Sequence, residues 1–417
     1  MKLTEKQWRR LVVAERIQKG QMTISEGAEA LGVSTRQMKR IRKDVSLMGA
    51  RAVQHGNTGR HPKHRIVDLV RTRIVQLRRE RYRGFNDQHF TEKLLEVEGL
   101  SISRSTVRRI LREVGIEAVR GRRSTKYRKR RDRRPQAGQM ILWDGSRHDW
   151  LEGRGPRLCL IAAIDDATGE LLPGGHFVEQ ECTVGYLRVL RELVADKGVP
   201  LAAYMDRHST LKRNDNKWSV EEQLAGRQEP THVKRALDDL GIQVLYALSP
   251  QAKGRVERLW GTLQDRLVSE LRLENACTAA EATAVLKDYR PGHNKRFAIP
   301  AQEAIQAWRP RPDADTLDTL CALQFVRRVA NNNSVRIGSK IVDIPRKPRG
   351  RSYAKAYVVV RHLLDGRYRI FHGGELIAEA AGLPPTESMH EPRSIVGRQV
   401  MHEKANTKRR VTESLNR

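Results

Sequence analysis

The chain lacks several features that would place it in common protein classes. It has no apolar run of about 18 residues and no signal-peptide pattern, so we expect a cytoplasmic protein without a membrane-spanning helix. Its four cysteines are scattered and form no CxxC pair: Cys159, Cys182, Cys277 and Cys321. Neither a zinc module nor a disulfide framework is therefore expected, and all four cysteines should pack as small apolar side chains.

Positive charge is in excess and is unevenly distributed. The net charge is +30, and residues 1–134 hold 36 Lys and Arg against 14 Asp and Glu. Residues 135–320 hold 24 against 27, and residues 321–417 hold 19 against 8. Basic surfaces release counterions from a phosphate backbone, so the two flanking parts are typical of nucleic-acid binding. The near-neutral middle must have another task, and the chain is long enough for roughly two to four domains.

Residues 1–50 predict a first helix-turn-helix unit. Thr4 and Gln7 have the spacing of a capping box, and ISEGAEALGVSTRQMKRIRK reads as a helix, a turn at Gly32 and a second helix capped by Ser34. A helical hairpin is also a common packing unit, so the pattern alone leaves DNA binding open. The outward residues of the second helix are long and polar, as contacts with phosphates and base edges require: Arg36, Gln37, Lys39 and Arg40.

A second unit of the same kind is expected over residues 63–118. A helix over about 63–81 precedes FTEKLLEVEGLSISRSTVRRILREVG, which reads as helix, glycine turn and helix, with Ser103 as the N-cap. Two such units beside the charge excess predict DNA binding. Residues 119–135 read as a basic linker that follows phosphates or a minor groove. The outward face of the last helix would hold Arg104, Ser105, Arg108, Arg109 and Arg112.

Strand and helix signals alternate over residues 136–310, which predicts an α/β domain. MILWDG reads as a strand that ends in Asp144, and PLAAYMD as another that ends in Asp206. A last strand, IQVLYAL, precedes a helix that carries Lys253 and Glu257 on one face. A different face of this helix forms an apolar stripe of Val256, Trp260, Leu263 and Leu267.

Asp144, Asp206 and Glu257 are candidate metal ligands. Three carboxylates held on a sheet can bind two Mg²⁺ ions about 3.5–4 Å apart, and such a pair activates a water or hydroxyl for in-line displacement at phosphorus. Two rival acids fit a local role better, because Asp165 and Asp166 fall in an expected hairpin turn, where Asp bonds the nearby backbone.

Three blocks of the middle region, GQMILWDGSRHDWL, YMDRHS and SPQAKGRVERLWGTLQDRL, resemble those of the DDE transposases with a retroviral-integrase-type catalytic core. The resemblance is closest to the ISNCY group of insertion-sequence transposases, and it extends to YRGFNDQHFTEKL, SRSTVRRILREVGI and YRPGHNKRFAIPAQEA. It implies an RNase H-like fold with a mixed five-stranded sheet, and two Mg²⁺ or Mn²⁺ ions bound by Asp144, Asp206 and Glu257. By the same resemblance, Lys253 would contact the DNA of the transposon end.

Two features depart from this family pattern. Asp206 and Glu257 are 51 residues apart, further than in retroviral integrases, because residues 207–230 read as an insertion. The N-terminal His/Cys zinc module of those enzymes is absent, and the helix-turn-helix units stand in its place. His208, two residues after Asp206, is a candidate to support a ligand or assist the leaving group, although an ordinary polar role fits it as well.

Residues 320–382 change to short strands separated by turn signals such as NNNS, DG and GG. Their close spacing predicts a small five-stranded β-barrel, similar to the SH3-like C-terminal domains of integrases. Its basic balance favours nonspecific DNA contact, and a purely structural barrel is the alternative. Residues 383–417 lack periodicity and are expected to be disordered.

These predictions combine into a multidomain DNA transposase with tandem all-α helix-turn-helix units, an α/β RNase H-like core and a small β-barrel. It would bind the terminal inverted repeats of an insertion sequence, cut by metal-dependent hydrolysis to free a 3′-OH, and join that hydroxyl to target DNA. We expect a homo-oligomer on double-stranded DNA, no membrane partner, and a prokaryotic, nucleoid-associated location. The alternatives are a non-catalytic DNA-binding regulator with an inactive core, and a tyrosine- or serine-type recombinase, for which the sequence shows no assembled nucleophile motif.

Overall fold

The protein is described here from a computed structural model. The structure describes residues 3–55, 66–119, 131–213, 218, 220–226, 228–246, 254–346, 350 and 352–386. The chain divides into two compact units, Met1–Arg73 and Ile74–Arg417. The predictions for Lys253, for most of the basic linker, and for nearly all of the expected tail fall outside the described residues.

The first unit holds three helices, α1 (Glu5–Gln18), α2 (Ile24–Leu31) and α3 (Thr35–Met48), followed by the 3₁₀ turn η1 (Gly49–Val53). The predicted capping box of Thr4 and Gln7 is present, and the hydroxyl of Ser34 caps α3. Gly32 ends α2 with φ +61°, a conformation that favours glycine. These local predictions are confirmed, and buried Ala14 and Met38 lie in the core that joins the helices.

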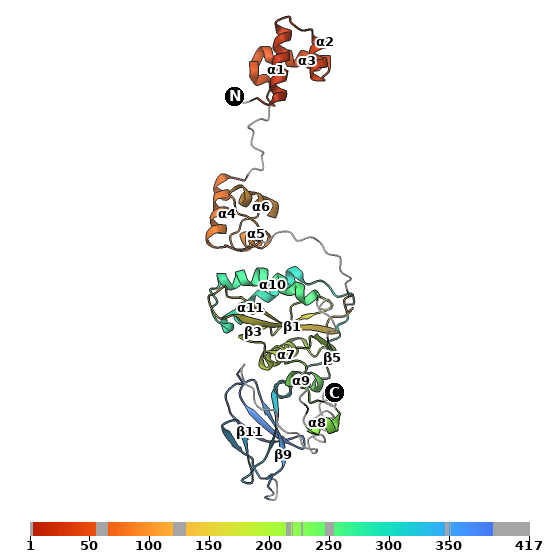
Figure 1. Cartoon of the computed structure of the whole chain (residues 1–417), viewed down its shortest axis with the longest axis vertical. Coiled ribbons are helices and arrows are strands. Elements are labelled where there is room, and N and C mark those ends of the chain that lie inside the picture. Colours follow the sequence, from red (N-terminus) through yellow and green to blue (C-terminus); the bar gives the residue numbers. More distant parts are fainter. Residues whose placement is uncertain are drawn as a thin grey trace. The chain divides into compact units, whose positions relative to one another are not determined.

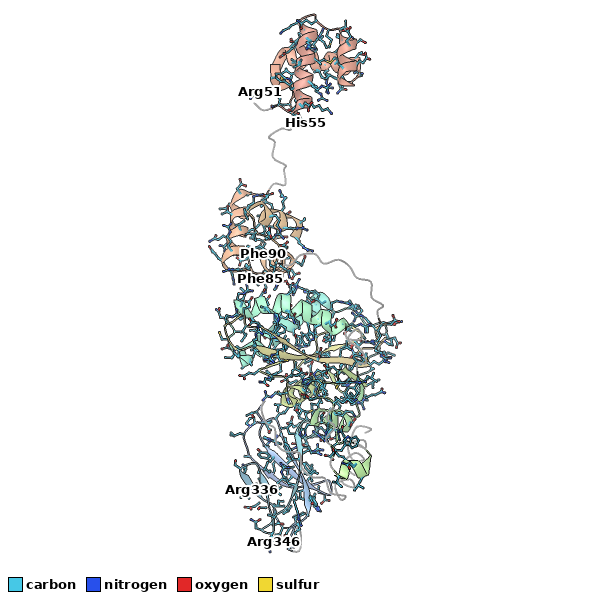
Figure 2. The ribbon with its side chains drawn as sticks, viewed as in Figure 1. Arg51, His55, Phe85, Phe90, Arg336 and Arg346 are labelled. Carbon is cyan, nitrogen blue, oxygen red and sulfur yellow. The ribbon has the colours of Figure 1, made fainter. Side chains whose placement is uncertain are left out.

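Three further helices follow in the chain, α4 (Asp68–Glu80), α5 (Asp87–Glu96) and α6 (Arg104–Glu113). The hydroxyl of Ser103 caps α6, as predicted. Aromatic side chains fill the small core beneath α5, where Phe85 and Phe90 are fully buried (Figure 2). The described part of the first helix begins at Asp68 rather than near residue 63.

A mixed five-stranded sheet forms the centre of the second unit, as the family resemblance implies. Its strands are β1 (Met140–His148), β2 (Leu158–Asp165), β3 (His176–Val178), β4 (Ala202–Met205) and β5 (Gln243–Tyr246), in the order β3-β2-β1-β4-β5. β1, β2 and β3 pair antiparallel, whereas β4 and β5 run parallel to β1. The parallel pairing places the ends of β1 and β4 at the same side of the sheet.

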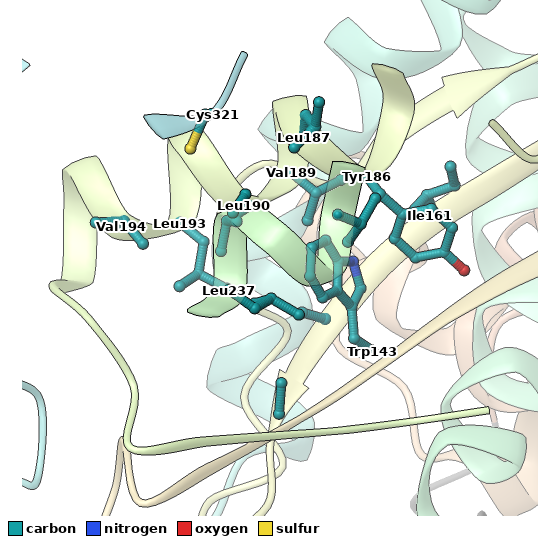
Figure 3. Packing of buried hydrophobic residues seen from close by; sticks show 14 of the residues in the cluster. Trp143, Ile161, Tyr186, Leu187, Val189, Leu190, Leu193, Val194, Leu237 and Cys321 are labelled. Carbon is teal, nitrogen blue, oxygen red and sulfur yellow. The ribbon is translucent and has the colours of Figure 1, made fainter. Parts of the chain in front are cut away.

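Helices cover both faces of this sheet (Figure 1). α7 (Thr183–Lys197) and α9 (His232–Asp239) lie on one face, and α10 (Gly254–Leu273) and α11 (Ala279–Phe297) lie on the other. Side chains alternate along a strand, so Trp143 packs against Tyr186 of α7, as Figure 3 shows, while its neighbour Leu142 packs beneath α10. Within the described residues of 207–230, the chain forms the short helix α8 (Val220–Ala225).

The predicted small five-stranded barrel is not confirmed, because the described C-terminal strands form no closed barrel. After α12 (Ala314–Leu320), the described strands are β6 (Leu323–Arg328), β7 (Ser334–Ile337), β8 (Lys340–Asp343), β9 (Tyr357–His362), β10 (Tyr368–His372) and β11 (Glu375–Ala380). They form a four-stranded sheet, β11-β10-β9-β6, and a separate β7-β8 hairpin around one shared apolar core. Gly338, with φ +60°, turns the chain between β7 and β8.

Three of the four cysteines are buried, as predicted, but Cys277 is exposed. All four are free thiols, which agrees with the scattered spacing. Among the helices that the structure describes, none is both long and apolar enough to cross a membrane.

Candidate active site

Asp144 lies inside a strand rather than at its end. β1 continues to His148 because that residue still pairs with Leu158 of β2. The prediction that the strand ends in Asp144 is therefore wrong, since the length of β1 is set by its partner strand. Asp206 directly follows β4, as predicted.

The parallel register of β1 and β4 brings the two aspartates level. Leu142 pairs with Tyr204, so the residues two positions further along, Asp144 within β1 and Asp206 directly after β4, continue the two chains at neighbouring positions. Asp144 also lies on the strand face that carries Met140 and Leu142, which pack beneath α10. The sheet thus presents one carboxylate toward α10 and a second one next to it.

α10 lies along β1 and is held there by polar contacts as well as by apolar packing. Nε1 of Trp260 donates a 3.2 Å hydrogen bond to Oδ2 of Asp144, and the Gln264 amide donates one of 3.2 Å to the Ser146 hydroxyl. Glu257 lies one helical turn before Trp260, and its side chain is exposed. The predicted apolar stripe is confirmed, because all four of its members are buried: Val256, Trp260, Leu263 and Leu267.

The three candidate ligands do not form a ready-made metal site. In the parts of the chain that the structure describes, no three His, Cys, Asp or Glu side chains are grouped so that they could hold a metal ion. The chemistry of Asp144, Asp206 and Glu257 nevertheless fits Mg²⁺ or Mn²⁺, because both are hard cations that prefer carboxylate oxygens.

Glu181 is an acid at this site that the sequence reading missed. Its Oε1 accepts a 2.6 Å hydrogen bond from the hydroxyl of Tyr186, which is fully buried. A Cβ on Gly145 would lie 3.0 Å from the Glu181 carboxylate, so this group packs directly beside the residue that follows Asp144. Burial raises the pKa of Glu181, and the negative charges of Asp206 and Asp144 raise it further.

A sequence signal for Glu181 existed. The residue lies three positions after the segment HFV, which forms β3, whereas Asp206 directly follows its strand, so an acid near a strand end was the available signal. Its approach to the aspartates depends on how β3 and α7 pack against the sheet, which the sequence pattern does not reveal.

His208 lies between two of these acids. Its backbone N–H donates a 2.8 Å hydrogen bond to Oδ1 of Asp206, and its Nδ1 lies 3.4 Å from Oε1 of Glu181. The same Nδ1 is 3.1 Å from the Thr210 hydroxyl. The imidazole is therefore held beside the aspartate pair, and its catalytic role stays a prediction.

Asp165 and Asp166 lie at the end of β2 and in the turn that follows it, as predicted, and both are buried. Asp165 accepts hydrogen bonds from the backbone N–H groups of Gly138 and Ala167 at 3.1 and 3.2 Å. Burial raises the pKa of Asp165 to about 6 despite these bonds. Asp166 is fully buried and lies 2.5 Å from the guanidinium groups of Arg131 and Arg255.

The predicted DNA-contact residues of α3 are all on its exposed face: Arg36, Gln37, Lys39 and Arg40. On α6 the same holds for Arg104, Ser105, Arg108 and Arg109. Arg112 differs, because its guanidinium lies 2.5 Å from Asp87 of α5 and also donates to the carbonyl of Ile116. The charge partner on the adjacent helix leaves Arg112 only partly exposed, and its contact with DNA stays a prediction.

Two known proteins are similar to this chain over most of its length. A Sinorhizobium fredii (strain NBRC 101917 / NGR234) protein described as a transposase, y4bF, is 34% identical over 393 residues, which cover 91% of this chain and 84% of the relative. The transposase for insertion sequence IS1202 of Streptococcus pneumoniae is 30% identical over 414 residues, which cover 88% of this chain and 86% of the relative. No family model matches the chain.

Solved structures with detectable likeness include retroviral integrases. The catalytic core domain of BIV integrase is 15% identical with a TM-score of 0.26, over 36% of this chain and 82% of that one. A chain of the simian T-cell lymphotropic virus intasome in complex with PP2A regulatory subunit B56 gamma is 13% identical with a TM-score of 0.32, over 74% and 98%. TM-scores this low do not by themselves establish a common fold.

Proposed function

The chain belongs to the insertion-sequence transposases with an integrase-like catalytic core, and from that premise we propose that it cuts the ends of its element and joins them to target DNA. The cut would be a hydrolysis that frees a 3′-OH, and the joining step a transesterification by that hydroxyl. The observation that carries the proposal is the level placement of Asp144 and Asp206, with α10 bonded to Asp144 through Trp260.

We assign Asp144, Asp206 and Glu257 as the ligands of two Mg²⁺ or Mn²⁺ ions. Bound there, the ions would activate the attacking oxygen and stabilise the leaving oxygen at the scissile phosphate. The chain's own part is to hold the oxygen donors. β1 holds Asp144, Asp206 directly follows β4, and α10 carries the exposed Glu257 one turn before Trp260, which bonds Asp144.

Two basic groups are proposed to act beside these acids. His208 is held between Asp206 and Glu181, where an imidazole can give a proton to the departing 3′ oxygen or fix the acid next to it. Lys253 would contact the phosphates of the transposon end. This role follows from the family resemblance, because Lys253 lies outside the described residues.

Recognition of the terminal inverted repeats is assigned to residues 1–134. The exposed basic faces of α3 and α6 support this, because long cationic side chains on a second helix can reach both phosphates and base edges.

The proposed domains are helix-turn-helix units over 1–50 and 63–118, a linker over 119–135, a catalytic core over 136–310 and a C-terminal β domain over 320–382. Joining two ends also requires more than one active site, so we propose a homo-oligomer on DNA, associated with the nucleoid.

The proposal is tested by separating binding from chemistry. Asp144→Asn, Asp206→Asn and Glu257→Gln should each keep specific end binding in a gel-shift assay and lose cleavage of the same ends. A non-catalytic DNA-binding regulator would show no cleavage even with the wild-type protein, at any Mg²⁺ or Mn²⁺ concentration. Specific end binding that survives deletion of residues 1–134 would overturn the assignment of recognition to this part.

A further inference from the structure

Asp166 is fully buried, and its carboxylate is bound by side-chain or backbone groups from two separate segments of the chain. One Oδ1 atom lies 2.5 Å from Nη2 of Arg131 and 2.5 Å from Nη1 of Arg255. Oδ2 accepts the backbone N–H of Arg134 at 2.9 Å. The backbone N–H of Asp166 itself donates to the carbonyl of Met140, the first residue of β1, at 2.9 Å.

These contacts reach elements that carry the candidate ligands. Arg255 lies in the first turn of α10, two residues before Glu257. The guanidinium of Arg131 lies over the ring of Tyr204, 5.9 Å from its centroid, and Tyr204 is two residues before Asp206 on β4. Arg255 also donates a hydrogen bond to the carbonyl of Arg131, so the two arginines are tied to each other as well as to Asp166.

The contacts along α10 show what the Asp166 pair adds. Three polar bonds set this helix against the sheet: Arg255 to Asp166, Trp260 to Asp144, and Gln264 to Ser146. Glu257 lies between the first and the second. Val256, buried in the same turn as Glu257, supplies apolar packing, and the Arg255–Asp166 pair adds a polar contact two residues before Glu257.

The contacts between Asp166 and the two arginines depend on the negative charge of Asp166. A buried carboxylate is stable only with charged or hydrogen-bonding partners, and two guanidinium groups this close to one another need a shared anion. If Asp166 were neutral, the two arginines would repel each other, and Arg255 would be free to leave with the first turn of α10.

We propose that Asp166 is a positioning residue of the active site, which fixes Glu257 through Arg255 and sets the basic segment Arg131–Arg134 beside it. The inference rests on the proposed function, because Asp166 is proposed to position Glu257, and Glu257 is a metal ligand only in that function. It gives Asp166 a task beyond the hairpin turn in which the sequence placed it. It also links the end of the basic linker to the helix that bears the third acid.

The test compares Asp166→Asn with the same substitution at another aspartate that pairs with two arginines, both in the full-length protein. Asp239 supplies the control, because it pairs with Arg235 at 2.9 Å and with Arg361 at 3.5 Å, and both arginines are buried. Asp166→Asn should lower kcat for end cleavage roughly 100-fold, the cost of a misplaced catalytic group, with little change in the DNA-end concentration at half-maximal rate. Asp239→Asn should lower the unfolding midpoint similarly and keep the wild-type kcat.

A readout independent of activity is Mn²⁺ binding, followed by electron paramagnetic resonance without DNA. Asp166→Asn should bind Mn²⁺ more weakly than wild type, whereas Asp239→Asn should bind it as wild type does. Asp166→Glu, which keeps the charge, should restore part of both the kcat and the Mn²⁺ affinity. Equal kcat and equal Mn²⁺ binding in Asp166→Asn and Asp239→Asn would overturn the proposal.

Substitutions of Arg131 and Arg255 test the two ion pairs of Asp166 separately. They remain informative if Asp166→Asn does not fold. Arg255→Ala should reproduce the loss of kcat and of Mn²⁺ affinity, because it acts on α10. Arg131→Ala should keep Mn²⁺ binding and instead change how accurately the cut is placed. An Arg255→Ala protein with normal kcat would refute the positioning role. If Asp144→Asn itself still cleaved, the proposed function would fail, and the behaviour of Asp166 would then not bear on it.

Discussion

The indole of Trp260 donates a hydrogen bond of 3.2 Å to the carboxylate of Asp144, and this bond joins the helix that carries Glu257 to the strand that carries the first aspartate. The two residues belong to two different sequence blocks of the family resemblance, GQMILWDGSRHDWL and SPQAKGRVERLWGTLQDRL. Because the donor is neutral and a carboxylate has two oxygens with several lone pairs, Asp144 can hold this bond and still bind a metal ion.

Trp260→Phe should lower end cleavage roughly 10- to 100-fold, as is usual when a partner of a metal ligand is removed. The apolar ring keeps the packing of α10 while the hydrogen bond to Asp144 disappears. Trp150→Phe is the matched control, because it removes a 3.1 Å indole bond to the carbonyl of Ser146 on the same strand without touching an acid. Equal cleavage rates in the two variants would show that the Trp260 bond serves packing alone.

Glu181→Gln should also reduce cleavage and leave end binding intact. The substitution removes a charge that lies beside Gly145 and His208 and keeps the size of the side chain. Glu192→Gln, on the exposed face of α7, provides the control for a charge change alone. Single-turnover cleavage at saturating Mg²⁺ measures the effect, and a rate equal to that of the Glu192 variant would remove Glu181 from the site.

Arginines one turn apart on α6 should behave differently. Arg108→Ala should weaken binding to the terminal repeats and reduce the log–log salt slope by about 0.9 for each DNA phosphate that the protein no longer neutralises. Arg112→Ala should instead lower the unfolding midpoint, because it breaks the pair with Asp87. Gel shifts over a salt series, together with thermal unfolding, distinguish the two. A salt slope that changes only for Arg112 would reverse these assignments.

The sequence predicted those features that depend on neighbours in the chain. The N-caps at Thr4, Ser34 and Ser103 are of this kind, and so is the strand that leads into Asp206. The sequence-based predictions failed where a residue distant in the chain determines the local structure. β1 runs past Asp144 because β2 pairs with it, and Arg112 is only partly exposed because it pairs with Asp87 of another helix.

Two acids show the same limit. Asp166 lies in the turn after β2, as predicted, but nothing local reveals that arginines from two other segments meet its carboxylate. Glu181 lies three residues after β3, and its pKa is raised by the charges of Asp206 and Asp144. Both cases concern tertiary contacts between acids and distant groups, which a one-dimensional pattern does not carry.

The stability of the core should fall as the pH drops from about 6.5 to about 4. Burial lowers the pKa of His293 to about 4, and the nearby charges of Arg266 and Arg296 lower it further. The unfolded state then binds more protons than the folded state between the ordinary histidine pKa and the lowered one, so acid favours unfolding. The contribution is at most about 3 kcal/mol.

Chemical denaturation of wild type and His293→Gln at pH 7 and pH 5 checks this effect. The variant should lose less of its unfolding free energy between these two pH values than wild type does. A wild-type difference that the substitution leaves unchanged would place the titrating group elsewhere.

The central claim is that Asp144, Asp206 and Glu257 act together on the DNA ends that residues 1–134 bind. The most direct measurement is a single-turnover assay of cleavage and strand transfer with Asp144→Asn, Asp206→Asn and Glu257→Gln, in Mg²⁺ and in Mn²⁺, on ends whose binding is measured in parallel. We predict that all three variants bind the ends as wild type does and neither cut nor join them. Strand transfer at the wild-type rate by any one of the three would contradict the account.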